Sequence, residues 1–386
     1  MDPVKDFLIV AIGGAGGDLQ PLVAAALALR ERGHHISFIG DRSVGRALSD
    51  LEVEVQVLPP EYDLGPRLAG AIRNAMAATA GDIVAAGPIV EQKVAEWAEQ
   101  VAVPIGHAIA ERQPNAVVTS LFGVEVVQRA APSCPWGVIN STFYLGPEPA
   151  RPLEEDIAVR AIPLLGRYAR LVSEASMVLH ATDQVFDFCF DRLPAGHHYV
   201  GPLGIWEPAM DPPSYLDEAG DPWVLVSISS QIQDDVPLAQ AALRALADKP
   251  VRVVVTLGPD HKPEEITEIP ANAHVEQTLS HSAVLQRAQL LVSHAGHGSV
   301  MKALWHGRPM VLMPWGRDQP GVAARALALG VAAVVPRGDN VEPALADAIS
   351  RTLANSDMQK AAATHSERLR KTDPPELTAS LLESLV

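Results

Sequence analysis

The sequence predicts an α/β protein made of two doubly wound, Rossmann-like domains. Apolar strand-like segments alternate with helix-like segments in both halves of the chain, and a proline-rich stretch separates the halves. Continuously apolar strands are typical of parallel sheets that are buried on both faces. A strand–helix–strand order also implies right-handed crossovers between parallel strands. The length of 386 residues allows two or three domains.

The first half contains six predicted strands and four predicted helices. The strands are expected at residues 7–12, 35–40, 53–58, 116–120, 136–140 and 176–181, the last of these ending the sheet of this half. The helices are expected at residues 21–32, 67–79, 89–112 and 157–172. The first helix has Pro21 at its start and Gly33 just past its end, the positions that these residues favour.

The second half repeats the alternation after a linker. Residues 201–222 contain five prolines, which stiffen the chain and remove backbone donors. We therefore predict a first domain over residues 1–205, a linker over 206–222, a second domain over 223–365 and a helical tail over 366–386 that could pack back on the first domain. Strands are expected at 223–229, 251–257, from 290, at 309–314 and 331–336, with helices at 236–247, 298–306, 319–329 and beyond 341. Ligands of such sheets bind beyond the carboxyl ends of the strands, here in a cleft between the domains.

Composition excludes several classes of protein. With 48% hydrophobic and 20% charged residues, the chain can form a full core. Its formal charge of −16 makes nucleic-acid binding a poor hypothesis. Cys134 and Cys189 have no Cys-x-x-Cys spacing, which argues against structural zinc and a disulfide framework. The apolar run at 7–12 is too short for a signal-peptide core, and no apolar run is long enough to span a membrane, so we expect a cytoplasmic protein without membrane insertion.

The loop after the first strand is rich in glycine and contains one carboxylate. Gly14 and Gly16 fit the first two glycines of a dinucleotide-binding fingerprint, but Leu19 occupies the third position, so nicotinamide binding is disfavoured. Asp18 has two interpretations. Aspartate is favoured as a helix N-cap, and a carboxylate facing a cleft can act as a general base. Both roles can coexist on one side chain.

A second loop, over residues 293–319, carries a more specific pattern. His294 and Ser299 flank a glycine-rich helix start, whose backbone amides could cradle a diphosphate. The alternative is a helix start eased by glycine, with Ser299 as its cap. Asp318 and Gln319 also follow a strand and precede a helix. A carboxylate beside an amide suits sugar hydroxyls, because the amide both donates and accepts hydrogen bonds.

These motifs resemble the inverting, nucleotide-sugar-dependent glycosyltransferases of the GT-B fold. The resemblance rests on His294-Ala-Gly-His-Gly-Ser299, Ala303-Leu304, Gly307-Arg-Pro-Met-Val311, Pro314, Asp318-Gln319, Gly17-Asp-Leu-Gln-Pro21, Leu29, Arg32-Gly-His34 and the strand 224–230. It extends over most of the chain. It is weakest across 60–115 and 141–222, where the family builds its acceptor pocket.

The resemblance implies a role for each matching residue. Asp18 takes the position of the catalytic base. The donor site would comprise Gly14, Ser229, Ser230, His281, His294, Gly296, His297, Gly298, Ser299, Asp318 and Gln319. In it, His294 and Ser299 hold the diphosphate, Asp318 and Gln319 bind the sugar, and His281 lies in the loop that borders the nucleobase. Met76, Phe143 and Tyr144 are weaker candidates for the acceptor pocket, with ordinary core packing as the alternative.

Two departures from the family pattern matter. Many members have histidine at the Asp18 position and an orienting aspartate where this chain has Ser120. The two changes fit together, because a carboxylate base needs no aspartate to set a tautomer. The chain also lacks the tryptophan that stacks on uracil in plant members, so a bacterial type that uses UDP- or dTDP-sugars is favoured. No Asp-x-Asp occurs, in keeping with metal-independent chemistry without a cofactor.

The resulting expectation is an inverting glycosyltransferase that moves a hexose to a hydroxyl of a small hydrophobic natural product. Its partners would be the nucleotide sugar and the acceptor, and the protein would be a monomer or a homodimer. One alternative is a glycolipid or cell-wall glycosyltransferase. Another is a catalytically silent auxiliary partner of a second glycosyltransferase, although such a protein would be expected to lose donor contacts that this chain retains.

Overall fold

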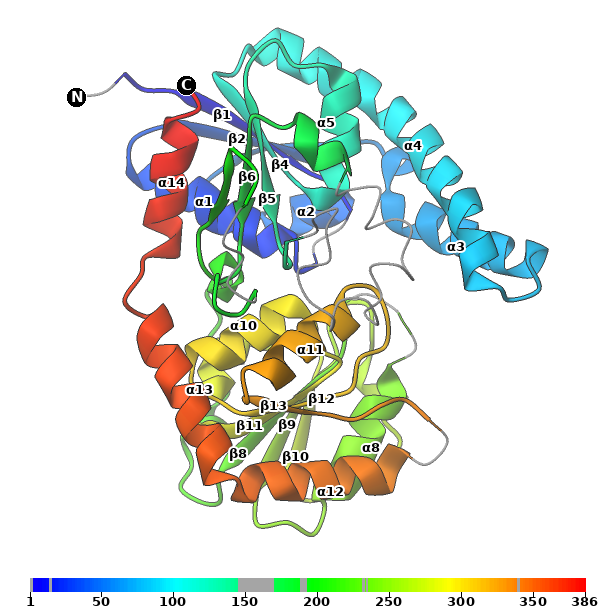
Figure 1. Cartoon of the computed structure of the whole chain (residues 1–386), viewed down its shortest axis with the longest axis vertical. Helices are drawn as coiled ribbons and strands as arrows, with labels where there is room; N and C mark the ends of the chain where they lie inside the picture. Colours follow the sequence, from blue (N-terminus) through cyan, green and yellow to red (C-terminus); the bar gives the residue numbers. More distant parts are fainter. Residues whose placement is uncertain are drawn as a thin grey trace. The chain divides into compact units, whose positions relative to one another are not determined.

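The computed structural model describes residues 3–13, 16–144, 170–187, 193–230, 233, 235–338 and 341–386. It divides into two compact units. The first comprises Met1–Leu203 and Asp373–Val386, and the second comprises Gly204–Thr372. Each unit has its own parallel sheet with helices packed against it (Figure 1). The predicted fold class of two Rossmann-like α/β domains is confirmed.

The first unit is built on a seven-stranded parallel sheet. Its strands, in spatial order, are β3 (Glu54–Val57), β2 (His35–Gly40), β1 (Asp6–Ala11), β4 (Ala116–Ser120), β5 (Trp136–Asn140), β6 (Met177–His180) and β7 (His197–Tyr199). In the centre, β1 pairs with β2 through Phe7↔Ile36 and with β4 through Phe7↔Ala116. Residues 7–10 are completely buried, which explains why this strand has no polar alternation.

Helices of the first unit connect these strands. They are α1 (Leu19–Glu31), α2 (Arg42–Ala47), α3 (Leu64–Ala78), α4 (Ile83–Arg112), α5 (Val124–Ala130) and α14 (Pro374–Glu383). Along the chain, α1 connects β1 to β2. The buried face of α1 contains Leu22, Val23 and Leu29. The carboxyl end of β1 and the start of α1 therefore meet in the glycine-rich loop around Asp18.

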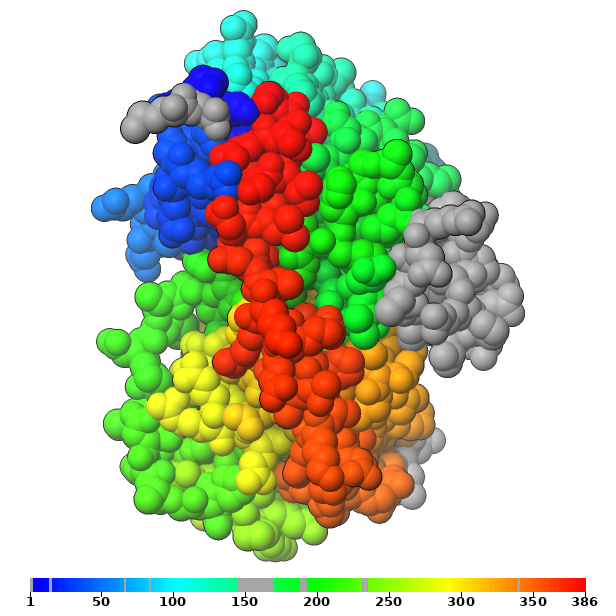
Figure 2. All heavy atoms as spheres, turned by 60° about the vertical axis from the view of Figure 1, so that its left-hand side comes forward, coloured from blue at the N-terminus to red at the C-terminus, as the bar shows by residue number. Residues whose placement is uncertain are grey.

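The C-terminal helix α14 belongs to the first unit and packs against α1. Figure 2 shows the end of the chain, in red, beside the N-terminal residues in blue. Arg32 binds Glu383 at 2.6 Å and also contacts Glu376, while the ring of His34 lies 2.7 Å from Glu383. The Arg32-Gly33-His34 segment thus holds the C-terminus in place.

The second unit is built on a six-stranded parallel sheet. Its strands, in spatial order, are β10 (Ala273–Glu276), β9 (Arg252–Thr256), β8 (Trp223–Ser227), β11 (Ala288–Ser293), β12 (Met310–Leu312) and β13 (Ala332–Val334). Its helices are α8 (Val236–Leu246), α9 (His281–Leu285), α10 (His297–Trp305), α11 (Gln319–Ala328), α12 (Val341–Ala354) and α13 (Ser356–Leu369).

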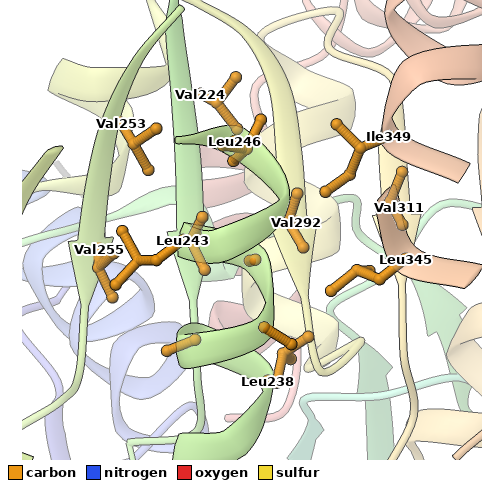
Figure 3. Close-up of a cluster of buried hydrophobic side chains, with 14 of the residues drawn as sticks. Val224, Leu238, Leu243, Leu246, Val253, Val255, Val292, Val311, Leu345 and Ile349 are labelled. Atoms are coloured by element: carbon orange, nitrogen blue, oxygen red, sulfur yellow. The ribbon is translucent and has the colours of Figure 1, made fainter. Parts of the chain in front are cut away.

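A buried cluster holds α8 and α12 on one face of this sheet. In Figure 3, Leu243 of α8 lies beside Val255 of β9, Leu246 of α8 lies beside Val224 of β8, and Leu345 of α12 lies near Val311 of β12. Each buried aliphatic side chain contributes about 1.5–3 kcal/mol relative to exposure. This apolar support fixes the carboxyl ends of β8, β11 and β12, where the loops with the candidate donor residues begin.

Several elements differ from the predictions. The first sheet does not end with β6, as predicted, because β7 adds a further strand at its edge. Neither β7 nor β10 was predicted, since their residues are only partly buried and include polar side chains, without a continuous apolar run. The short helices α2 and α5 were also missed. Most of the helix predicted at 157–172 lies outside the described residues.

The proline-rich segment makes specific contacts within the second unit. The Tyr215 ring stacks on His274 with centroids 3.9 Å apart, and its hydroxyl donates to Glu276 at 2.9 Å. Asp217 pairs with Arg287. The segment predicted as a linker therefore covers one edge of the second sheet. At the other end, the expected boundary at residue 366 falls inside α13, and the second unit continues to Thr372.

Candidate functional site

Asp18 immediately precedes α1, at its N-cap position, but its side chain does not cap that helix. The residue has helical dihedral angles and makes no capping hydrogen bond. Instead, its carboxylate accepts a hydrogen bond from the hydroxyl of Ser141, in the loop after β5. The cap interpretation of Asp18 is therefore wrong for its side chain, and Ser141 restricts where the carboxylate can point.

The neighbouring loops keep this end of the sheet tightly packed. Gly13 has a φ of +103°, and a methyl group there would lie 3.0 Å from the side chain of Phe122. Ser120, at the position where many family members have aspartate, is buried. Its hydroxyl has no hydrogen-bond partner among the described residues. The structure thus brings Ser141 rather than Ser120 to Asp18. Gly14 lies outside the described residues.

The loop between β11 and α10 contains a sharp turn in the backbone. Ala295 adopts the left-handed conformation, with a φ of +69°, which turns the chain sharply after His294. Such a conformation costs energy for a residue other than glycine and is often found at functional sites. The turn brings the His294 ring close to Gly296. A methyl group on Gly296 would lie 2.5 Å from Nε2 of that ring, so any side chain there would force the ring to move.

His294 is 7% exposed, and its ring is oriented by groups on the neighbouring strand and loop. Nδ1 lies 3.3 Å from the backbone oxygen of Ser227 on β8 and 3.9 Å from a carboxylate oxygen of Asp235. Burial lowers the pKa of His294, while Asp235 and the hydrogen bond to Ser227 oppose that shift. The ring is held beside the amino end of α10, which favours negative charge.

The other residues of the predicted diphosphate cradle surround the same helix start. His297, Gly298 and Ser299 form the first turn of α10; His297 is buried and the other two are partly buried. Ser229 is buried in the loop just after β8, and its backbone N–H donates to Asp235 at 2.7 Å. The carboxyl ends of β8 and β11, which are adjacent strands, bring Ser229 and His294 together.

Gln319 supports its own loop. Its side-chain oxygen accepts from the backbone N–H of Trp315 at 2.8 Å and of Gly316 at 3.1 Å. Its amide nitrogen donates to the side chain of Gln233 at 2.9 Å. Asp318 precedes α11 without a capping hydrogen bond from its side chain. Sugar binding by Asp318 and Gln319 stays a prediction.

The Gln319→Ala variant separates loop support from sugar binding. If the amide contacts the sugar, the variant changes the ranking among nucleotide sugars more than it changes affinity for the free nucleoside diphosphate. We expect both effects. One amide N–H of Gln319 donates to Gln233 and supports the loop, so its loss lowers affinity for both ligands. The other N–H is the one that would donate to the sugar, so the change in ranking should be larger. Kinetics with several donors and calorimetry with the nucleoside diphosphate measure them. An equal loss for both ligands would assign Gln319 to loop support alone.

His281 begins helix α9 and is fixed from two sides. Its Nε2 lies 2.9 Å from the hydroxyl of Thr256, and its backbone N–H donates to Glu207 at 3.0 Å. Burial and nearby Lys302 lower its pKa to about 4, so the ring is neutral at neutral pH. His281 therefore belongs to a rigid loop, and its role near a nucleobase stays a prediction.

Glu207, in the proline-rich segment, organises this loop. Its carboxylate accepts hydrogen bonds from Ser280 and Ser282 and lies 2.9 Å from the ammonium of Lys302 on α10. Burial alone would raise the pKa of Glu207, but Lys302, His281 and the accepted hydrogen bonds outweigh it and lower the pKa to about 2. The pair thus ties α9 to α10.

This pKa shift predicts a pH-dependent contribution to stability. The folded-state pKa of Glu207 is about 2, below the unfolded value of about 4.3. Its contribution is therefore complete above about pH 4.3 and is lost as the pH falls toward 2. Glu207→Gln should cost about 3–5 kcal/mol at pH 7, because Lys302 stays buried without its partner. Melting curves of both proteins at neutral and acidic pH test this: the gap must narrow in acid, and a constant gap would contradict it.

The candidate acceptor residues have different environments. Phe143 is 1% exposed, as expected of a core residue. Tyr144 packs edge-on against His180 and His197. Met76 on α3 is partly buried. A separate pocket of about 350 Å³ lies between α3 and α4, lined by Leu64, Arg67, Leu68, Gly70, Ala71, Asn74, Ile89, Lys93, Val94, Glu96, Trp97 and Gln100.

Sequence reasoning missed Ser141, Glu207, Gln233 and Asp235. Asp235 immediately precedes α8 and could have been noted as a helix N-cap, yet its side chain makes no cap hydrogen bond. Ser141 follows a predicted strand, which placed it at the correct end of the sheet. No local signal marks Glu207, because its partners are more than 70 residues away in the chain.

Two parallel-sheet units, with a histidine–glycine helix start after the central strand β11 of the second, correspond to the GT-B architecture. Residues 8–91 match the glycosyltransferase family 28 N-terminal domain. Residues 240–384 match the erythromycin biosynthesis protein CIII-like C-terminal domain. Together the matches cover more than half of the chain. The chain belongs to the GT-B natural-product glycosyltransferases.

Individual relatives agree with this assignment. The chain is 32% identical over 163 residues to 4'-demethylrebeccamycin synthase of Lentzea aerocolonigenes, a match that covers 42% of this chain and 38% of that protein. It is 23% identical over 408 residues to demethyllactenocin mycarosyltransferase of Streptomyces fradiae, covering 96% of this chain and 85% of the relative. The solved structure of the glycosyltransferase VinC in complex with dTDP has the same fold, with a TM-score of 0.69 and 18% identity over 98% of this chain and 99% of that one.

The described residues contain neither a candidate membrane span nor a candidate metal cluster. No helix among them is both long and apolar enough to cross a membrane. Within the same part of the chain, no group of three or more His, Cys, Asp or Glu side chains is placed to hold a metal ion.

Proposed function

We propose that the protein is an inverting, metal-independent glycosyltransferase that moves a hexose from a UDP- or dTDP-sugar to a hydroxyl of a small hydrophobic natural product. The observation that carries this proposal is the arrangement at the start of α10. A buried imidazole, a glycine that only just accommodates it and a helix amino end converge after the central strand β11. These are the groups that a diphosphate needs.

In this proposal the second unit binds the donor. His294, Ser299 and the amides of Gly296 to Gly298 bind the diphosphate. As the bond between the anomeric carbon and the diphosphate oxygen breaks, negative charge grows on the leaving group. Hydrogen-bond donors that are fixed in place stabilise that charge without reorganising. Ser229 and Ser230 lie beside the phosphates, and the loop with Asp318 and Gln319 faces the sugar.

The first unit provides the base. Asp18 accepts the proton of the acceptor hydroxyl while the hydroxyl oxygen attacks the anomeric carbon. The new carbon–oxygen bond forms on the face opposite the departing diphosphate, so the configuration at that carbon inverts. The hydrogen bond from Ser141 supports this role, because it restrains the carboxylate without neutralising it.

The relatives support the substrate classes. The VinC structure holds dTDP, and the proteins named above take part in rebeccamycin and lactenocin chemistry. A thymidine or uridine diphosphate is therefore the donor group proposed for this chain. The pocket between α3 and α4 has an apolar floor that includes the buried residues Leu64, Val94 and Trp97, which supports an acceptor with an apolar body.

One experiment tests the proposed function directly. The protein is incubated with a panel of UDP- and dTDP-sugars and with hydrophobic phenols and alcohols, and the products are analysed by mass spectrometry and by NMR of the anomeric proton. Glycoside formation with inverted configuration is expected. Retention of configuration would contradict the single displacement. Failure to bind any nucleoside diphosphate would favour the auxiliary-partner alternative.

A further inference from the structure

A buried carboxylate outside the predicted site connects three of its parts. Asp235 is 0% exposed and precedes α8. One of its oxygens accepts from the backbone N–H of Ser229 at 2.7 Å and from the side chain of Gln233 at 3.0 Å. Gln233 in turn accepts from Gln319 at 2.9 Å. The same carboxylate oxygen lies 3.9 Å from Nδ1 of His294.

The groups around Nδ1 determine the tautomer of His294. A backbone carbonyl and a carboxylate can only accept hydrogen bonds. Nδ1 faces the backbone oxygen of Ser227 at 3.3 Å and the carboxylate of Asp235 at 3.9 Å, and the Ser293 hydroxyl, which can also accept, lies 3.5 Å away. This arrangement favours a proton on Nδ1. In the neutral ring, Nε2 then has a lone pair and no proton. Nε2 is the nitrogen that lies over Gly296 at the start of α10.

An ionised diphosphate also only accepts hydrogen bonds. For His294 to donate to it through Nε2, the ring must gain a second proton and become an imidazolium. Other charges reach the same ring: Arg317 in the loop after β12 opposes the added charge and Asp318 favours it, while His281 on α9 lies close enough to interact. Among these groups, the Asp235 carboxylate, at 3.9 Å from Nδ1, favours the imidazolium most strongly.

We propose that Asp235 is a positioning residue that orients His294 and stabilises its charged form, so that binding of a nucleoside diphosphate is accompanied by uptake of a proton at His294. The inference rests on the proposed function, since it concerns the same diphosphate site. In the free protein, burial lowers the pKa of His294 and so favours the neutral ring. Affinity must then fall as the pH rises above the pKa of the free ring.

The experiment measures dTDP and UDP binding by calorimetry from about pH 6 to about pH 8.5, where the terminal phosphate, with a pKa near 6, is ionised over most of the range. For uptake of about one proton, affinity falls about tenfold per pH unit above the pKa of the free ring. Repeating the titration at one alkaline pH in buffers with different ionisation enthalpies counts the protons. Wild-type protein that binds without proton uptake would overturn this inference and leave the proposed function intact. Absence of binding would overturn both.

Two variants assign the proton. His294→Gln still offers an amide donor but cannot titrate, so its weaker binding should lose most of the pH dependence. Asp235→Asn keeps the size and one acceptor oxygen but removes the charge. In that variant, affinity at alkaline pH should fall about tenfold or more, and the pH above which affinity declines should move downward. An unchanged pH profile in Asp235→Asn would overturn its role. If Asp235→Asn fails to fold, the comparison of wild type with His294→Gln still decides whether the ring takes up the proton.

Discussion

Replacement of Asp18 by asparagine is expected to lower the rate of sugar transfer to an aliphatic alcohol by about 10²- to 10⁴-fold. The amide cannot accept the hydroxyl proton, although it can still accept the hydrogen bond from Ser141. Because the Asp18 side chain makes no cap hydrogen bond to α1, stability should stay within about 1 kcal/mol of wild type. Steady-state kinetics, melting curves and calorimetry with nucleoside diphosphate provide the measurements.

The choice of acceptor and one partner variant sharpen this test. A phenol ionises more easily than an aliphatic alcohol, so Asp18→Asn should impair transfer to a phenol less. Ser141→Ala keeps the carboxylate but removes its hydrogen-bond donor, and it should cost much less activity than Asp18→Asn. Normal transfer to the alcohol by Asp18→Asn would place the base elsewhere. Early melting would instead assign Asp18 a structural role.

The second large effect is expected from Gly296→Ala. The backbone of Gly296 has a φ of −61° and a ψ of 132°, which alanine adopts without strain. The added methyl group would nevertheless lie 2.5 Å from Nε2 and 3.1 Å from Cε1 of His294. The ring must move away from the helix start, and it would then lose the contact with the diphosphate that we propose. A charge-assisted hydrogen bond is worth about 1.5–3 kcal/mol, so affinity should fall about ten- to a hundredfold.

A double variant shows whether the methyl group acts through His294. His294→Ala should weaken nucleoside diphosphate binding by a similar factor, and adding Gly296→Ala to it should cost little more, because the ring that clashed is gone. Gly65→Ala is the matched control, since a methyl group there meets nothing within 4 Å. It should leave donor affinity unchanged. Fully additive losses in the double variant would show that Gly296 affects the site by another route.

The central strands could be predicted because a short run of mostly apolar residues indicates a buried strand. The predicted bounds 35–40, 116–120 and 136–140 agree with β2, β4 and β5, whose buried residues are mostly apolar. The short strands β7 and β10 carry no such signal, because their residues are only partly buried and include polar side chains. The alternation of strand-like and helix-like segments therefore predicts the class of fold. The number of strands in each sheet depends on pairing between segments that are distant in sequence.

The candidate diphosphate-binding part of the donor site was predicted from one contiguous pattern. The segment from His294 to Ser299 joins a buried strand to a helix start, so local rules alone bring its glycines and side chains together. Asp235 was not predicted because its contact with His294 joins residues 59 positions apart, carried by the adjacent strands β8 and β11. The sequence contains both residues but no local feature that pairs them.

By itself, the sequence determined the two-domain α/β class, the family resemblance and the loops that hold the candidate residues, because strand composition, turns and helix starts are local properties. Only the tertiary structure decided how those residues are used. It showed that the Asp18 side chain contacts Ser141 instead of capping α1, and that Gln319 supports its own loop. It also showed which nitrogen of His294 faces acceptors. These outcomes depend on hydrogen bonds between segments that come together only when the sheets form, and directional bonds of this kind require a fixed geometry.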